Sequence, residues 1–268
     1  MIEKYKNHLI SDCKSQNTIR SYIDSIRELL KKIKIENLTK ETLSNYFLEL
    51  KKTQSAKSIN KYKSGIRSFL KFLEKDKNIV PKDEKIPERL PEFITEEYLE
   101  NNVIPVIESV SPNPIKMKAI LYFMFYTGLR VSEVVLMKRK NIDLKKRIHK
   151  FYIQKGKKER LGLITSKKAS IFIQHYFSIE PETKNAFNMN YYALKQWFKN
   201  YKCYFKDINF KPHLFRHSFA TYCRKIGMPL EDIKELMGHS NIQTTMIYAH
   251  VNIDDIKKRC DEAIKKRR

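Results

Sequence analysis

The chain has 268 residues, of which 41% are hydrophobic, and this is enough to build two small domains or one large one. Lysine and arginine number 54 against 30 aspartates and glutamates, a formal net charge of +24. The excess occurs in both halves, since residues 1–80 carry 18 basic and 9 acidic side chains. That distribution favours a protein that lays both halves on a long polyanion. From charge alone, a lysine-rich surface without such a partner is the alternative.

Several other classes of protein are disfavoured. The N-terminus, MIEKYKNHLI, has no apolar signal core, and the most apolar run, residues 119–126, is too short to span a bilayer. A basic segment with a large apolar face, which would favour a membrane surface, does not stand out. The cysteines lack the paired spacing of a disulfide framework or a zinc cage; they are Cys13, Cys203, Cys223 and Cys260. We therefore expect a cytoplasmic protein.

Residues 15–75 have helical periodicity, with three apolar stripes separated by lysines. Thr39 is a candidate cap for the second of these helices. The pattern predicts a helical, basic bundle over residues 1–76. Residues 77–92 follow without periodicity and contain three prolines and many charges, which is typical of a linker.

A second domain is expected over residues 93–268. It begins with an apolar helix at 115–126 that is interrupted by Thr127-Gly128. Residues 142–164 alternate apolar and polar side chains, which predicts a β-hairpin or small antiparallel sheet with a basic turn. Prolines and glycines bracket two later helices, at Pro212, Gly227, Pro229 and Gly238. The predicted fold is mainly α with a small antiparallel β-sheet: a helical bundle plus a mixed α+β domain.

The segment KPHLFRHSFATYCR places His213, Arg216 and His217 on one face of a helix, because residues three and four apart are neighbours there. An arginine flanked by two histidines near a helix N-terminus can bind an anion. A solvated basic face is the ordinary alternative. A zinc site is disfavoured, because the histidine pair has no acidic residue between it and no third ligand at a fixed offset.

Two further segments carry candidate residues. In YTGLRVSE, Arg130 follows a glycine that breaks an apolar helix, and Glu133 is placed to brace it; an internal ion pair is the alternative. In GHSNIQTTMIYAHV, His239 follows a glycine helix stop and Tyr248 comes nine residues later. A lone tyrosine is more often a packing residue than a nucleophile.

Taken in order, these segments resemble the tyrosine recombinase family. The matching stretches are TGLRVSE, QKGKKER, HLFRHSFAT and MGHSNIQTTMIYAHV, and they extend over residues 93–250 at the family's spacings. The N-terminal bundle looks like the family's core-binding domain, and the compact size is similar to the Xer branch and to short archaeal integrases. Departures are mild: Gly162 replaces a more usual branched residue, and Met237 stands where leucine is common.

The resemblance implies a role for each matching position. Arg130 and Arg216 would grip the scissile phosphate, and Tyr248 would attack the phosphorus to form a 3′-phosphotyrosyl bond. Lys155 would protonate the leaving 5′-oxygen. The remaining expected residues complete or support the site: His213 and His239 in the pocket, Glu133 and His217 as supporting residues, and Lys157, Lys158 and Arg160 as DNA contacts.

The function implied is site-specific recombination, either Xer-like chromosome dimer resolution or mobile-element integration and excision. The substrate would be double-stranded DNA with an inverted-repeat site, bound by a tetramer that forms a Holliday junction, with or without an accessory protein. We expect no metal and no cofactor, because no carboxylate cluster accompanies the motifs and the covalent intermediate conserves the bond energy. The alternatives are a type IB topoisomerase and a catalytically silent DNA-binding regulator of the same fold.

Residues 252–268 read as an amphipathic helix after Tyr248. The resemblance suggests that this helix docks on a neighbouring subunit in a cyclic assembly. Packing on its own domain is the alternative.

Overall fold

In the computed structural model, the chain forms two compact units, Met1–Arg89 and Leu90–Arg268. Their boundary lies inside the segment 77–92 that the sequence marks as a linker. Within the described part of the chain, every helix is too short or too polar to cross a membrane. For residues 152, 153, 158 and 159 the structure describes the backbone but not the side chains. The residues that the structure describes are 1–87, 91–153, 158–180, 183 and 185–238.

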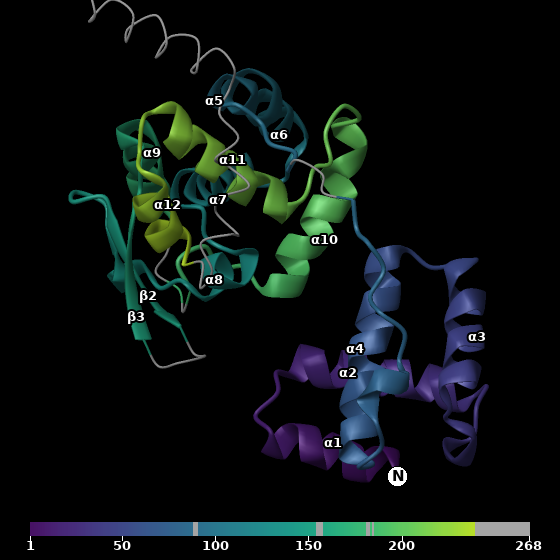
Figure 1. Cartoon of the computed structure of the whole chain (residues 1–268). Coiled ribbons are helices and arrows are strands. Elements are labelled where there is room, and N and C mark those ends of the chain that lie inside the picture. The colour runs from purple at the N-terminus through teal and green to yellow at the C-terminus, as the bar shows by residue number, and fades with distance from the viewer. Residues whose placement is uncertain (88–90, 154–157, 181–182, 184, 239–268) are drawn as a thin grey trace, which may run out of the picture. The chain divides into compact units, whose positions relative to one another are not determined.

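The N-terminal unit is a bundle of helices (Figure 1). Hydroxyl groups of Ser15, Thr39 and Ser55 accept hydrogen bonds from backbone amides three residues on, and so begin three of the helices. The first helix was not expected from the periodicity. It is held by Tyr5 and Leu9, one turn apart and fully buried. The helices are α1 (Ile2–Ser11), α2 (Gln16–Leu30), α3 (Lys40–Lys51) and α4 (Ala56–Phe72), with short turns of 3-10 helix at Ile35–Asn37 and Lys77–Ile79.

The beginning of the predicted linker is bound to α4 by polar side chains. Lys63 has a side chain only 1% exposed, and its Nζ donates to Glu84 Oε1 at 2.7 Å and to the Lys82 carbonyl at 2.5 Å. Asn60 exchanges two hydrogen bonds with the backbone of Glu84, at 2.9 and 2.7 Å. A buried ammonium requires such partners, because an unpaired buried charge is costly. Residues 82–84 therefore belong structurally to the N-terminal unit.

This arrangement predicts a large effect of Glu84→Ala on the N-terminal unit. The substitution leaves the Lys63 ammonium buried without its carboxylate, and should lower the free energy of unfolding by about 3 kcal/mol. Asp83→Ala is the matched control, since it removes a carboxylate that is 52% exposed and pairs with Arg67 at the surface. The control should cost less than about 1 kcal/mol. Urea unfolding of the N-terminal unit measures both; equal losses would contradict the assignment.

The second unit is mainly helical with a small sheet, as the sequence predicts (Figure 1). Its apolar centre is α7, whose side chains are all buried from Ala119 to Thr127 and which packs against α6, α9 and α11. The helices are α5 (Glu96–Tyr98), continued by a π-helical turn (Leu99–Val103), α6 (Ile104–Val110), α7 (Pro114–Thr127), α8 (Val131–Leu136), α9 (Lys167–Ile179), α10 (Tyr191–Tyr201), α11 (Pro212–Lys225) and α12 (Leu230–Met237), with 3-10 turns at Arg139–Asn141 and Lys202–Tyr204.

The helix ends fall where proline and glycine predict them. Pro212 occupies the first turn of α11, and Pro229 immediately precedes α12. The ends of α7 and α12 are Gly128 and Gly238, both in the left-handed conformation that favours glycine. The sequence therefore places these helix boundaries correctly.

Among the described residues, the strands β1 (Ile142–Asp143), β2 (Ile148–Ile153) and β3 (Lys158–Leu163) form an antiparallel sheet in that order. This confirms the small sheet expected over 142–164. In the register of β2 and β3, His149 lies opposite Gly162. A Cβ at position 162 would overlap the His149 imidazole, which is fully buried. Glycine at this position thus makes room for a buried histidine.

The pairing predicts that Gly162→Val and His149→Ala are coupled. Valine alone would overlap the imidazole and should destabilise the second unit by about 1–3 kcal/mol. Alanine alone leaves a cavity beside Phe123 and should also destabilise it. The double variant should lose clearly less than the sum of the two, because the valine then occupies the vacated space. Thermal unfolding of the four proteins tests this, and strict additivity would refute it.

Candidate active site

Arg130 follows a turn that only glycine can make. Gly128 ends α7 with a φ of +63°, and the Phe219 ring of α11 occupies the space that a Cβ would need. The chain then enters α8 with Arg130 as its N-cap. The Arg130 side chain remains 42% exposed. A short, tightly packed turn therefore presents a partly exposed guanidinium.

Glu133 lies against Arg130, as its position three residues later predicts. Its carboxylate accepts hydrogen bonds from the Arg130 backbone amide at 2.8 Å and from Arg130 Nη1 at 3.1 Å. The Glu133 side chain is only 9% exposed. A carboxylate that binds both the backbone and the guanidinium of one residue fixes the direction in which that side chain leaves the turn.

Arg216 joins three segments of the second unit. It lies on α11 and is buried, and its guanidinium donates to the carbonyl of Gly128 and to that of Met237, both at 2.6 Å. Gly128 belongs to the turn that carries Arg130, and Met237 is the last residue of α12. The Gly128 carbonyl that Arg216 binds lies two residues before Arg130. The structure thus places two arginines that are 86 positions apart in the sequence at the same turn, the one that follows α7.

The two histidines of α11 differ in exposure. His213 is exposed and His217 is half-buried, with ring centroids 6.5 Å apart. Burial lowers the pKa of His217 to about 4, and the neighbouring His213, Arg216 and Lys211 lower it further. His217 is therefore a neutral imidazole at neutral pH.

Several expected residues lie outside the described part of the chain. These are Lys155, Lys157, His239 and Tyr248, together with the amphipathic segment 252–268. Lys158 is described only as a backbone position in β3. Their predicted roles stay predictions.

Arg160 is expected as a DNA contact, but the structure places its side chain in the interior. The side chain is 9% exposed, and Nη2 lies 3.6 Å from Glu133 Oε2. Its neighbour on β3, Leu161, is 57% exposed instead. The sequence pattern of the strand points the other way, because alternation puts Leu161 and Leu163 on one face of β3 and Arg160 and Gly162 on the other.

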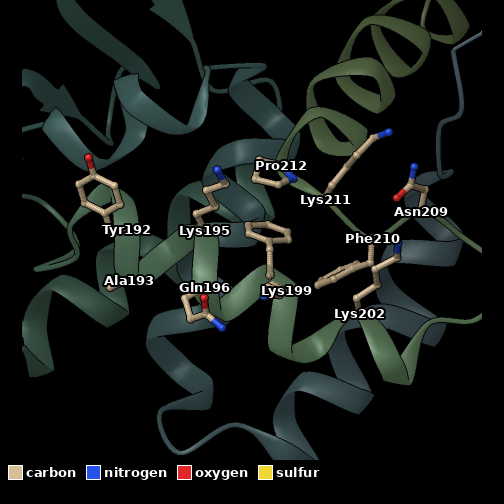
Figure 2. A pocket seen from close by; sticks show the side chains of 11 residues that line it. Tyr192, Ala193, Lys195, Gln196, Lys199, Lys202, Asn209, Phe210, Lys211 and Pro212 are labelled. Atoms are coloured by element: carbon tan, nitrogen blue, oxygen red, sulfur yellow. The ribbon is translucent and has the colours of Figure 1, made fainter. Parts of the chain in front are cut away.

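A basic hollow of about 790 Å³ lies beside the start of α11 (Figure 2). Phe198 and Phe210 supply apolar lining, and none of the described residues that line it is acidic. Its lysines come from α10 and from the segments that follow it: Lys195, Lys199, Lys202 and Lys211. Lys211 and Pro212 lead directly into the helix that carries His213 and Arg216. The hollow is thus a cationic surface next to the candidate site.

Within the described residues, no three histidine, cysteine, aspartate or glutamate side chains are grouped as a metal ion would require. Glu133 is paired with cationic side chains, Arg130 and Arg160.

Two family models match the chain. The N-terminal SAM-like domain of phage integrases matches residues 2–77, and the phage integrase family itself matches residues 93–254. The chain belongs to the phage integrase family. The second match spans every candidate catalytic position from Arg130 to Tyr248.

Curated relatives of this phage integrase family member are tyrosine recombinases. XerA of Thermococcus onnurineus is 27% identical over 278 residues, which cover 98% of this chain and 95% of that protein. XerC of Bacillus licheniformis is 29% identical over 282 residues, covering 91% and 89%. The resemblance inferred from the four motifs is confirmed.

Solved structures of the family share the fold. The Tn1549 transposon integrase, solved with transposon right end DNA, superposes with a TM-score of 0.73 at 18% identity and covers 98% of this chain and 99% of its own. A lambda integrase tetramer bound to a Holliday junction gives 0.73 at 14% identity, covering 90% and 76%. The predicted fold, a helical bundle plus a mixed α+β domain, is confirmed.

Acid should destabilise the second unit through two histidines whose pKa is lowered, His149 and His217. Burial, and next the charge of Arg160, lower the pKa of His149 from 6.5 to about 4. Between these two values the unfolded chain binds a proton that the folded unit does not, so stability falls as the pH drops from about 6.5 to 4. The slope for one histidine is about 1.4 kcal/mol per pH unit.

Urea unfolding of the catalytic unit at several pH values measures this slope. His149→Phe should remove about half of the slope, because His217, whose pKa is also lowered to about 4, keeps its own contribution. His175→Gln, which changes an exposed histidine on α9, should leave the slope as it is. An unchanged slope in His149→Phe would show that the acid sensitivity arises elsewhere.

Proposed function

We propose that the chain is a site-specific DNA recombinase that cleaves and rejoins strands through a 3′-phosphotyrosyl intermediate. The observation that carries the proposal is the meeting of Arg130 and Arg216 at one turn, with Arg216 bound to the Gly128 carbonyl. Forked guanidiniums held in place before the substrate arrives can stabilise the negative charge that develops on phosphoryl oxygens. The family and its recombinase relatives support the same activity.

In the proposed reaction, the Tyr248 oxygen attacks the scissile phosphorus and the bond from phosphorus to the 5′-oxygen breaks. Lys155 donates a proton to the leaving 5′-oxygen, and a histidine of the pocket, His213 or His239, accepts the tyrosine proton. A 5′-hydroxyl then attacks the phosphotyrosine to rejoin the strands. No step needs a metal ion, a cofactor or ATP, because the covalent bond conserves the energy of the phosphodiester.

The substrate we propose is a DNA duplex with inverted-repeat arms, bound by a tetramer. Related structures are of an integrase with transposon DNA and of a tetramer on a Holliday junction, and these support the assignment. The lysine-lined hollow beside α11 offers cations to the phosphate backbone. The proposal places the protein with the chromosome, in the cytoplasm.

The two alternatives are not favoured. A silent DNA-binding regulator would not need the complete set of reacting residues that the motifs supply, and a type IB topoisomerase would not be expected among recombinase relatives. Covalent trapping on genomic fragments, followed by sequencing of the attached DNA, gives the target. A single chromosomal site would assign the protein to dimer resolution, and the ends of a mobile element would assign it to integration and excision.

The nucleophile can be tested with a nicked suicide duplex that carries the trapped site. Wild-type protein should accumulate a covalent protein–DNA adduct, and Tyr248→Phe should form none while binding the duplex with unchanged affinity, because one hydroxyl contributes little to a large charged interface. Tyr204→Phe, at an exposed tyrosine outside the lysine-lined hollow, is the matched control and should react normally. Adduct formation by Tyr248→Phe at the wild-type rate would reject the assignment.

A further inference from the structure

Arg160 is a buried cation that no part of the proposed reaction uses. Its side chain is 9% exposed, and none of its guanidinium nitrogens has a hydrogen-bond partner among the described residues. Burial lowers the pKa of Arg160 and the charge of Glu133 opposes that effect. An arginine nevertheless keeps its proton at neutral pH, so the interior holds a full positive charge.

The first neighbour of this charge is the carboxylate that orients Arg130. Arg160 Nη2 lies 3.6 Å from Glu133 Oε2, the same oxygen that accepts the hydrogen bond from the Arg130 backbone amide. Glu133 Oε1 faces Arg130 Nη1 at 3.1 Å. The carboxylate is therefore held from two sides. Because the Glu133 carboxylate is shared between Arg130 and Arg160, its negative charge does not fully neutralise Arg130. The positive charge of Arg130 therefore remains available to bind a phosphate.

The second neighbour is the end of α12. A Cβ placed on Gly238 would overlap the Arg160 guanidinium, so the side chain packs directly on the glycine Cα. The adjacent residue, Met237, supplies the carbonyl that Arg216 binds at 2.6 Å. β3 and α12 also lie close to each other. Arg160 thus touches the support of Arg130 on one side and the segment that Arg216 holds on the other.

We propose that Arg160 is a positioning residue that sets the charge and orientation of Arg130 through Glu133, and that it does not contact DNA. The inference rests on the proposed function, because its consequence is a faster cleavage step. It revises the role expected from the sequence, in which Arg160 follows the basic turn as one more phosphate contact.

The two roles predict opposite results for Arg160→Met. A positioning residue leaves the affinity for DNA within about twofold and slows adduct formation at saturating protein by about 10- to 100-fold, since small displacements of a reacting group cost that much. A phosphate contact weakens affinity and lowers the salt dependence of binding by about one unit, with little change in the rate at saturation. The second pattern would overturn the inference.

The control is Lys150→Met, which removes an exposed positive charge from the same sheet and leaves Glu133 untouched. It should cleave at the wild-type rate once DNA is saturating. Arg160→Lys keeps a charge near Glu133 but not the fork, and should recover part of the rate. If Arg160→Met does not fold, Arg160→Lys supplies the comparison: slower cleavage at unchanged affinity supports positioning, and a wild-type rate rejects it.

A double-mutant cycle then tests the route through Glu133. Glu133→Gln should slow cleavage by itself, and adding Arg160→Met should produce little further loss, because the second residue acts through the first. Multiplicative losses would show that Arg160 acts independently of Glu133 and would overturn the inference. Adduct formation by the wild-type protein distinguishes failure of the proposed function from failure of the role of Arg160. If the wild-type protein forms no adduct, both are rejected. If it forms the adduct and Arg160→Met cleaves at the same rate, only the role of Arg160 is rejected.

Discussion

The guanidinium of Arg216 is the interaction on which the second unit depends. Its two hydrogen bonds, each 2.6 Å long, reach from α11 to the turn after α7 and to the end of α12. Both acceptors are backbone carbonyls at helix ends, which lack partners within their own helices. A charge this deeply buried is costly without such partners. Correct placement of the arginine and correct packing of three helices therefore require each other.

A second constraint is the sharing of one carboxylate between two arginines. Glu133 is buried, and it faces the partly exposed Arg130 on one side and the buried Arg160 on the other. Removal of a partner from such a group leaves a charge in low dielectric, where its effect on neighbouring groups is strong. The site is thus electrostatically organised before DNA is bound. This suits a reaction in which catalysis is stabilisation of negative charge on a phosphate.

The N-terminal unit also contains a buried charge that is balanced by a carboxylate from a distant segment. The ammonium of Lys63 is buried against Glu84 and the Lys82 carbonyl, and this contact binds the first part of the expected linker to α4. A chain segment rich in proline and charge would read as flexible from composition. Ion pairing with a buried partner instead gives residues 82–84 a defined place in the N-terminal unit.

Much of the molecule follows from local sequence. The helix boundaries at Pro212, Gly128 and Gly238 are determined by the intrinsic backbone preferences of proline and glycine. The order of the four motifs is enough to name the family. The pairing of Arg130 with Glu133 is also local, because three residues on a helix bring two side chains together.

The tertiary structure decided what local rules leave open. Hydrophobicity alone would favour a β3 strand that buries Leu161 and exposes Arg160. The structure instead buries Arg160, because its guanidinium packs against Glu133 and against Gly238. In the same strand Gly162 accommodates His149, which lies 13 positions away and only meets it across the sheet. Local preference determines where an element begins and ends, whereas the partner that balances a buried charge or fills a space comes from distant parts of the chain.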